Sequence, residues 1–564
     1  MSAAVLSSIN RNPLFRSLIF VVLAAALVIA LWPTFQAAGQ PEDEGIALVH
    51  PELFLKGRLP YRDFERIYGP GNLLILAAAY PIFGTNVFVE RAVGLGYRLL
   101  ILLSIFGIAK RWGTLVATAC GLVALVVLGN SEVWANTWMA ASAFALCAFW
   151  MLANVESHRR CFAGGFFAAV ALLCRCDFGL ALSIAMIPLF FAMGATAKKM
   201  FLGGVALGLL PLFWLAVVVG PLQLVDKLFL LPVFRISSGG YLPIAAASTD
   251  VVAVFCVYVA ASAINVTAGL LALRKSAAER DRLLLAISIF GLGLIHYALS
   301  RFDSGHVFNT ALVSFLFLPA SISVLFSLVA KPLPQWVGIA VVITLALSAL
   351  QLLSMVPHKR GIFIQQNGRV FPVAKTQAPE AAQAALSELE RISSPDQRLF
   401  VGPADLRRTL YCDTWIYHLF PQLTPATYFL EMNPGSANAP GSRLARDVAS
   451  ADWLILNRAW DDIFEPNRSS EYGPDEPNDV VRTDFDLWAK YRPYLIFRNQ
   501  RLRNLVVPPA APPGGGISRR DKSLSIPPLL RRPNMLCRGN RRVRLVPRNI
   551  FPLRPQSPLG MQTP

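Results

Sequence analysis

Charged residues are scarce in this 564-residue sequence, and long apolar segments separate them. Only 15% of the residues are charged, against about 25% in soluble domains, and 55% are hydrophobic. The mean hydropathy of +0.50 is too high for an ordinary soluble protein of this length. The composition therefore predicts a polytopic α-helical membrane protein.

Nucleotide-binding motifs are absent. The sequence contains neither a Walker phosphate-binding loop nor the glycine-rich fingerprint of dinucleotide-binding folds, so a nucleotide-driven mechanism has no support. The basic excess gives no support to nucleic-acid binding either. Residues 508–564 hold eleven basic residues against the single acid Asp521, which accounts for +10 of the formal net charge of +18.

The cysteine pattern also lacks a recognisable site. Cys174 and Cys176 do not have the two-residue gap of a zinc knuckle, and no pair of His or Cys completes a site. We therefore expect no disulfide framework, no structural metal and no cofactor, while dependence on a divalent cation stays open. Six of the eight cysteines lie in or beside apolar segments, namely Cys120, Cys147, Cys161, Cys174, Cys176 and Cys256, and the other two are Cys412 and Cys537.

Eleven apolar segments are each about as long as a single membrane-spanning helix requires, roughly 17 to 25 residues. The first is longer than the apolar core of a usual signal peptide, so we expect an uncleaved anchor. The eleven predicted spans are residues 18–35, 93–109, 114–129, 134–153, 162–174, 178–194, 201–219, 251–273, 283–299, 307–329 and 336–353.

A twelfth apolar segment, residues 72–83, is short and decides the topology. If it spans the membrane, every later loop changes side; if it lies in the interface, the basic loops gather on one side. The positive-inside rule favours the interfacial position, with a cytoplasmic N-terminus. The acidic stretch after residue 36, the loops at 220–250 and 300–306, and everything after about 357 are then outside. The basic residues sorted in this way are Arg11 and Arg16, Lys110 and Arg111, Arg159 and Arg160, Lys198 and Lys199, Arg274 to Arg282, and Lys331.

Residues 40–71 form the longest polar interruption between two apolar segments, and Glu42, Asp43 and Glu44 lie at its start. Pro41 predicts that a helix from the preceding span stops there, which places the three acids in non-helical backbone beyond a membrane surface. In a partly dehydrated pocket, repulsion and desolvation raise a carboxyl pKa toward general-base strength. The alternative, with equal weight, is a solvated loop end.

Two further charged groups lie at predicted outer ends of helices, where charge near the membrane is costly. Arg175 with Asp177 fits either interfacial ion pairing or a functional role. In the sequence RFDSGH, Arg301, Asp303 and His306 share a tight turn between spans, which favours function. Such a turn presents Arg301 or His306 to a phosphate.

Residues 357–507 have a mixed composition and are numerous enough for a separate domain. A helical pattern at 379–391 and three short strands predict a small extracytoplasmic α/β domain. The candidate strands are 398–401, 426–430 and 453–457. Residues 508–564 are rich in proline and arginine and are expected to be a disordered tail.

Short motifs follow one another in the first 110 residues. After a membrane helix come DEG at Asp43 to Gly45, KGRLPYRDF at Lys56 to Phe64, YGPG at Tyr68 to Gly71, FG at Phe83 and Gly84, and Arg91 before the next span. This order resembles the GT-C class of membrane glycosyltransferases, in the branch of protein O-mannosyltransferases and aminoarabinose transferases. It implies a GT-C-type transmembrane domain over residues 1–356, with a first outer loop at 36–92, in a bacterial inner membrane.

The resemblance implies an inverting transferase that takes a sugar from a polyprenyl-phosphate carrier and passes it to an envelope glycan, lipid or protein. In that family an acid of the first outer loop activates the acceptor. Asp43 matches this acid, and Glu44 is expected to support it or to bind substrate. Glu42 precedes the matched pair, which leaves the register of the catalytic acid open.

Chemical reasoning adds further candidates. Guanidinium groups fit phosphate oxygens, so Arg62 or Arg301, together with His306, are candidates to hold the leaving phosphate. The candidates to position substrate or loops are Tyr61, Asp63, Tyr68 and Asp303.

Two other functions compete with transfer. A transporter or a flippase for lipid-linked sugars is the main alternative, because charged groups at membrane depth also mark transport paths. No inverted repeat is visible in the sequence, however. A non-catalytic scaffold for envelope assembly is the third possibility.

Overall fold

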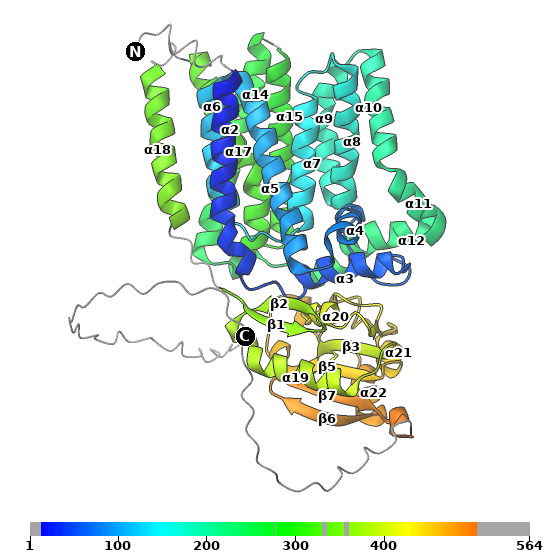
Figure 1. Ribbon diagram of the computed structural model, residues 1–564. Helices are drawn as coiled ribbons and strands as arrows, with labels where there is room; N and C mark the ends of the chain where they lie inside the picture. The colour runs from blue at the N-terminus through cyan, green and yellow to red at the C-terminus, as the bar shows by residue number, and fades with distance from the viewer. Residues whose placement is uncertain (1–12, 277, 330–334, 355–359, 505–564) are drawn as a thin grey trace, which may run out of the picture. The chain divides into compact units, whose positions relative to one another are not determined.

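A computed structural model describes residues 13–276, 278–329, 335–354 and 360–504 (Figure 1). The described residues up to 354 are mostly helical, with long helices lying side by side. The helices that fall on the predicted spans are α2 (Pro13–Leu31), α5 (Val87–Ala109), α6 (Thr114–Gly129), α7 (Thr137–Met151), α8 (His158–Cys174), α9 (Cys176–Ala192), α10 (Ala195–Gly208), α11 (Leu210–Val219), α14 (Thr249–Ser276), α15 (Glu279–Gly293), α16 (Ile295–Ser300), α17 (Ser304–Val329) and α18 (Gln335–Ser354).

Each of the eleven predicted spans coincides with one of these helices or with two consecutive ones. Among the described residues, five helical stretches are long and apolar enough to cross a membrane. The number is six if α10 and α11, which are bent by 43°, count as one span. The chain is therefore a multi-pass membrane protein, and the total of eleven crossings stays a prediction.

Two further helices, α3 (Asp43–Leu55) and α4 (Gly71–Phe83), lie between α2 and α5. The prediction of non-helical backbone is wrong for two of the three acids, because Asp43 and Glu44 form the first turn of α3, whereas Glu42 lies in the turn before it. Pro41 lies before that helix, where its missing N–H breaks no helical hydrogen bond. Acidic side chains in a first turn are stabilised by the helix dipole.

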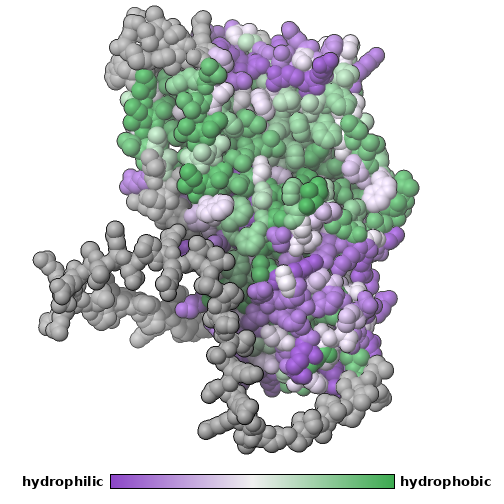
Figure 2. All heavy atoms as spheres, in the orientation of Figure 1, coloured by the Kyte–Doolittle hydropathy of each residue, from purple (hydrophilic) through white to green (hydrophobic). Residues whose placement is uncertain are grey.

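The predicted loop at 220–250 also contains helical segments. These are α12 (Pro221–Val225), the π-helical η3 (Asp226–Ile236), α13 (Ser237–Gly240) and the 3-10 helix η4 (Ile244–Ala246). Leu222, Val233 and Phe234 expose their apolar side chains here. Apolar residues also cover much of the long helices, whereas polar residues dominate the surface of the C-terminal part (Figure 2).

Helices α8 and α10 pack with their backbones close together. A Cβ atom on Gly165 would lie 2.0 Å from the carbonyl oxygen of Phe201, and one on Gly204 would lie 2.0 Å from that of Phe162. Small residues allow this close approach between membrane helices, which gain little from the hydrophobic effect inside lipid. Alanine at either glycine would push the two helices apart.

The C-terminal part is an α/β structure. Strands β1 (Ile362–Gln366) and β2 (Arg369–Val373) form an antiparallel pair. The larger sheet has the order β4-β3-β5-β7-β6, in which β3 is parallel to β4 and β5 while the other pairs are antiparallel. The remaining elements are β3 (Arg398–Pro403), β4 (Thr424–Pro425), β5 (Trp453–Asn457), β6 (Phe485–Tyr491), β7 (Tyr494–Asn499), α19 (Pro379–Ile392), α20 (Trp415–Leu419), α21 (Leu444–Ala449) and α22 (Glu476–Asp484).

Most of the predicted α/β elements are confirmed. The helix at 379–391 corresponds to α19, and the strands at 398–401 and 453–457 correspond to β3 and β5. The prediction of a strand at 426–430 is wrong. The backbone N–H of Tyr428 donates to Asp447 Oδ2 at 2.8 Å, and its carbonyl accepts from Glu65 N at 2.7 Å, so these groups are not used in a strand ladder.

The α/β part packs against α3 and the turn that follows it. The Trp415 N–H donates to the Pro41 carbonyl at 3.1 Å, and Arg369 binds Glu52 at 2.6 Å. The described residues belong to one compact unit. The domain boundary at 357 and the outer location of this part stay predictions. The predicted tail at 508–564 lies outside the described residues.

Candidate active site

Asp43 is solvent-accessible at the first turn of α3, although protein surrounds much of its side chain. Loss of hydration raises the pKa of Asp43 above its ordinary value, and the positive charges of His306, Arg301 and Arg175 oppose this rise. A carboxyl with a raised pKa and access to solvent can accept a proton from a bound hydroxyl near neutral pH.

Glu42, immediately before α3, is half-buried. Burial raises the pKa of Glu42 well above its ordinary value, and repulsion from Asp43 adds to the effect. Two adjacent carboxyls in such surroundings resist simultaneous ionisation. Glu42 is therefore the weaker candidate for a charged base.

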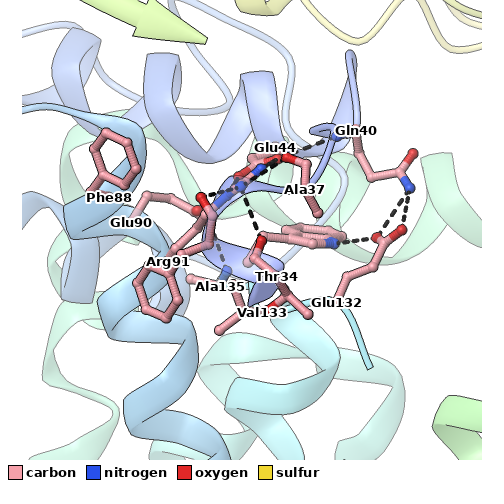
Figure 3. A network of polar contacts seen from close by, with 12 residues as sticks. Thr34, Ala37, Gln40, Glu44, Phe88, Glu90, Arg91, Glu132, Val133 and Ala135 are labelled. Carbon is pink, nitrogen blue, oxygen red and sulfur yellow. Dashed lines mark hydrogen bonds and ion pairs between the residues drawn. The ribbon is translucent and has the colours of Figure 1, made fainter. Parts of the chain in front are cut away.

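Glu44 is fully buried and forms an ion pair with Arg91 (Figure 3). Arg91 Nε lies 2.6 Å from Glu44 Oε1, and Nη2 lies 3.0 Å from Oε2. The same Oε2 accepts from the Gln40 N–H at 3.2 Å. Because both of its oxygens already accept hydrogen bonds, Glu44 has a structural role in this geometry. The catalytic role expected for Glu44 stays a prediction.

The predicted turn between α16 and α17 gathers Arg301, Asp303 and His306. Arg301 Nε donates to Asp303 Oδ2 at 2.9 Å, and His306 Nδ1 lies 2.8 Å from Asp303 Oδ1. Burial alone would raise the pKa of Asp303, but the hydrogen bond and charge of His306, with the charge of Arg301, lower it to about 2. Asp303 thus orients both basic groups.

Arg175, between α8 and α9, is buried among aromatic rings. Its guanidinium carbon lies 4.0 Å from the ring centre of Trp138, 4.7 Å from that of Tyr297 and 5.0 Å from that of Tyr68. Two hydrogen bonds to Asp177, at 2.9 and 2.5 Å, hold its orientation. This residue does not snorkel toward solvent, because aromatic faces stabilise its charge in a dry setting.

The His306 ring extends the same cluster. It stacks on Tyr297 with 5.3 Å between ring centres and 19° between planes, and it meets the edge of Trp138 at 6.1 Å. Tyr68 belongs here as well, since it contacts Arg175 and its pKa is raised by burial and then by the charge of Asp43.

The other candidates from residues 36–92 lie in the segment between α3 and α4. Tyr61 is buried and donates its hydroxyl to the Tyr68 carbonyl at 2.8 Å. Arg62 is exposed and pairs with Asp63 at 2.8 Å, while Asp63 also accepts from Leu59 N. These contacts shape the loop, and the phosphate contact predicted for Arg62 stays a prediction.

The α/β part contributes residues that the sequence reasoning missed. Glu465 binds Arg301, and Tyr411 donates its hydroxyl to Glu465 at 2.9 Å. Glu431 is buried, which raises its pKa to about 8, and the nearby charges of Arg66, Glu65 and Asp43 also act on it. No local motif marks these acids, since they lie in loops far from Asp43 in the chain.

The charge pattern limits what the site can hold. Among the described residues, no group of three or more His, Cys, Asp or Glu is arranged to hold a metal ion. The positive charges that act most strongly on Asp43 are those of His306, Arg301 and Arg175. Guanidinium and imidazolium groups suit the oxygens of a phosphate, and a neighbouring carboxylate suits a hydroxyl.

Two similar solved structures are of ArnT from Cupriavidus metallidurans, one bound to undecaprenyl phosphate and one in the apo state. The TM-scores are 0.54 and 0.51, with 14% sequence identity in both cases. Each comparison covers 85% of this chain and 97% of the ArnT chain. No protein-family model matches the sequence, and no curated protein matches it.

ArnT is a GT-C aminoarabinose transferase. The chain therefore has the fold of the GT-C class of membrane glycosyltransferases.

Proposed function

We propose that this protein is an inverting glycosyltransferase that moves a sugar from a polyprenyl-phosphate donor to an acceptor of the cell envelope. The observation that carries the proposal is the position of Asp43. This acid keeps solvent access, has a raised pKa and lies within the electrostatic reach of Arg175, Arg301 and His306.

The reaction requires a base for the acceptor hydroxyl and positive charge for the leaving phosphate, and these groups supply both. Asp43 accepts the proton of the acceptor hydroxyl as its oxygen attacks the anomeric carbon. The bond between that carbon and the phosphate oxygen breaks, and its electron pair leaves with the phosphate. The positive charges of Arg175, Arg301 and His306 stabilise the charge on the leaving phosphate. Attack from the face opposite the leaving group inverts the anomeric centre.

A lipid-linked donor also suits the setting. Its polyprenyl chain requires lipid, whereas its phosphate and sugar require polar groups near the membrane surface. ArnT provides a precedent in which this fold binds undecaprenyl phosphate. With the cytoplasmic side assigned from the basic loops, the reaction takes place at the outer face of a bacterial inner membrane.

The test is transfer by the purified full chain in liposomes that contain a radiolabelled polyprenyl-phosphate sugar and an envelope acceptor fraction. We expect labelled acceptor and free polyprenyl phosphate in equal amounts, with the opposite anomeric configuration in the product. Movement of intact donor across the bilayer without cleavage would instead identify a flippase. Neither transfer nor movement would favour a scaffold.

A further inference from the structure

The first turns of α5 carry buried charged side chains that reach two separate outer segments (Figure 3). Asn86 caps this helix, accepting from the Phe88 and Val89 N–H groups at 3.0 Å. Glu90 and Arg91 follow, with 0% and 2% of their surfaces exposed. Adjacent residues of a helix point about 100° apart, so the two side chains can serve different neighbours.

Arg91 fixes the segment that leads into α3. Besides Glu44, its Nη1 contacts the carbonyl oxygens of Thr34, Phe35 and Ala37 at 3.2, 2.8 and 3.0 Å. These bonds hold the backbone before α3 and its first turn at the same time. Asp43 is the neighbour of Glu44, so its position depends on this guanidinium.

Glu90 fixes the segment that leads into α7. One of its oxygens, Oε1, accepts from the Ala135 N–H at 2.6 Å. Two turns along α5, Arg98 supports the same segment by donating to Ser131 Oγ at 2.9 Å and to the Glu132 carbonyl. The segment continues into α7, whose Trp138 stacks on Arg175.

The second oxygen of Glu90 has an unusual neighbour. Oε2 is buried and has no hydrogen-bond partner among the described residues, and the charge of the Glu44 carboxylate acts on Glu90. Two neighbouring carboxylates that are shielded from water repel each other strongly. One proton between them removes the repulsion, supplies the missing hydrogen bond and leaves Arg91 balanced by a single negative charge.

We propose that Glu90 is a positioning residue that carries a proton and joins the Asp43 segment to the Trp138 segment through Glu44 and Ala135. In this arrangement the Glu90 hydroxyl donates to Glu44, while Oε1 keeps the Ala135 N–H. Side chains of the single helix α5 thus hold both Asp43 and the aromatic rings around Arg175, which fixes the separation between them. The effect on transfer rests on the proposed function, whereas the proton on Glu90 does not.

The first test measures the proton without any substrate. The infrared spectrum of the purified wild type at neutral pH is compared with that of Glu90→Gln. We expect the wild type to contain the carbonyl stretch of a protonated carboxyl that the variant lacks. Identical spectra in this region would overturn the proposal, and this result does not depend on whether the protein transfers a sugar.

The second test separates positioning from charge. Glu90→Gln can donate to Glu44 and accept from Ala135, so we expect its detergent melting temperature and its kcat for transfer to stay within about twofold of wild type. Glu90→Leu keeps the size and loses both bonds. We expect its kcat to fall by about 100-fold, the cost of misplacing reacting groups by about 1 Å, with a smaller change in KM for the donor. Equal losses in both variants, or full activity in Glu90→Leu, would contradict the proposal.

Discussion

Arg301 and Glu465 form a two-point ion pair between the turn before α17 and a loop of the α/β part. Glu465 Oε1 lies 2.5 Å from Arg301 Nη2, and Oε2 lies 2.9 Å from Nη1. A phosphate presents its oxygens to a guanidinium in much the same way. If Arg301 holds the donor phosphate as proposed, the carboxylate of Glu465 occupies the edge of the guanidinium that the phosphate would need.

Replacing Glu465 by glutamine is expected to strengthen donor binding. The amide competes less well than a carboxylate for Arg301, so we expect the donor KM to fall about fivefold, the equivalent of about 1 kcal/mol. Initial rates at varied donor concentration give this value. Glu471→Gln is the matched control, because Glu471 pairs with the exposed Arg468. A KM that rises in Glu465→Gln would show that the pair only supports Arg301.

The rate of transfer is expected to depend on the ionisation of Asp43. Because a base must be ionised, kcat/KM should rise as the pH increases through the raised pKa of Asp43 and then level off. His306 lowers this pKa and Glu132 raises it. The rising limb should therefore move to higher pH in His306→Asn and to lower pH in Glu132→Gln. Shifts in the same direction in both variants would contradict this electrostatic account.

The buried pair of Arg91 and Glu44 is expected to contribute strongly to stability. Arg91→Met leaves Glu44 buried without its charge partner, which should cost about 3 to 5 kcal/mol of unfolding free energy. Arg62→Met is the control, because Arg62 and Asp63 form a more exposed pair worth about 0 to 1 kcal/mol. Melting in detergent compares the two variants. Similar melting temperatures would show that the buried pair is dispensable.

The orientation in the membrane can be tested with single cysteines in a cysteine-free background. Lys275 and Asp462 are both exposed, and the predicted topology places them in the cytoplasm and outside, respectively. An impermeant maleimide added to intact cells should label Asp462→Cys and leave Lys275→Cys unlabelled until the cells are opened. The reverse pattern would invert the topology.

Local patterns predicted much of this fold. Apolar segments located the long helices, because lipid-facing and core positions both require apolar side chains. The amphipathic sequence at 379–391 and the buried strand at 453–457 were also readable. The hairpin of β6 and β7 was missed, because β6 exposes much of its surface and lacks a simple alternation. Pro41 was misinterpreted, since proline also precedes helices.

Only part of the candidate site could be predicted from the sequence. Asp43 and the RFDSGH turn stood out because charge is rare near the membrane. Glu465 and Glu431 did not, since acids are ordinary in polar loops and only the tertiary fold brings them to Arg301 and Asp43. The buried contact of Glu44 likewise depends on Arg91, 47 residues away in the chain.

The most direct test of the account is sugar transfer by Asp43→Asn. Asparagine keeps nearly the same shape but cannot accept the proton, so we expect the rate to fall by about 100-fold or more with donor binding largely retained. Glu42→Gln, matched for its position beside Asp43, should be much milder. The measurement is the initial rate of transfer from a polyprenyl-phosphate sugar by folded variants in liposomes. A wild-type rate in Asp43→Asn would contradict the assignment of Asp43 as the base, whatever the rate in Glu42→Gln.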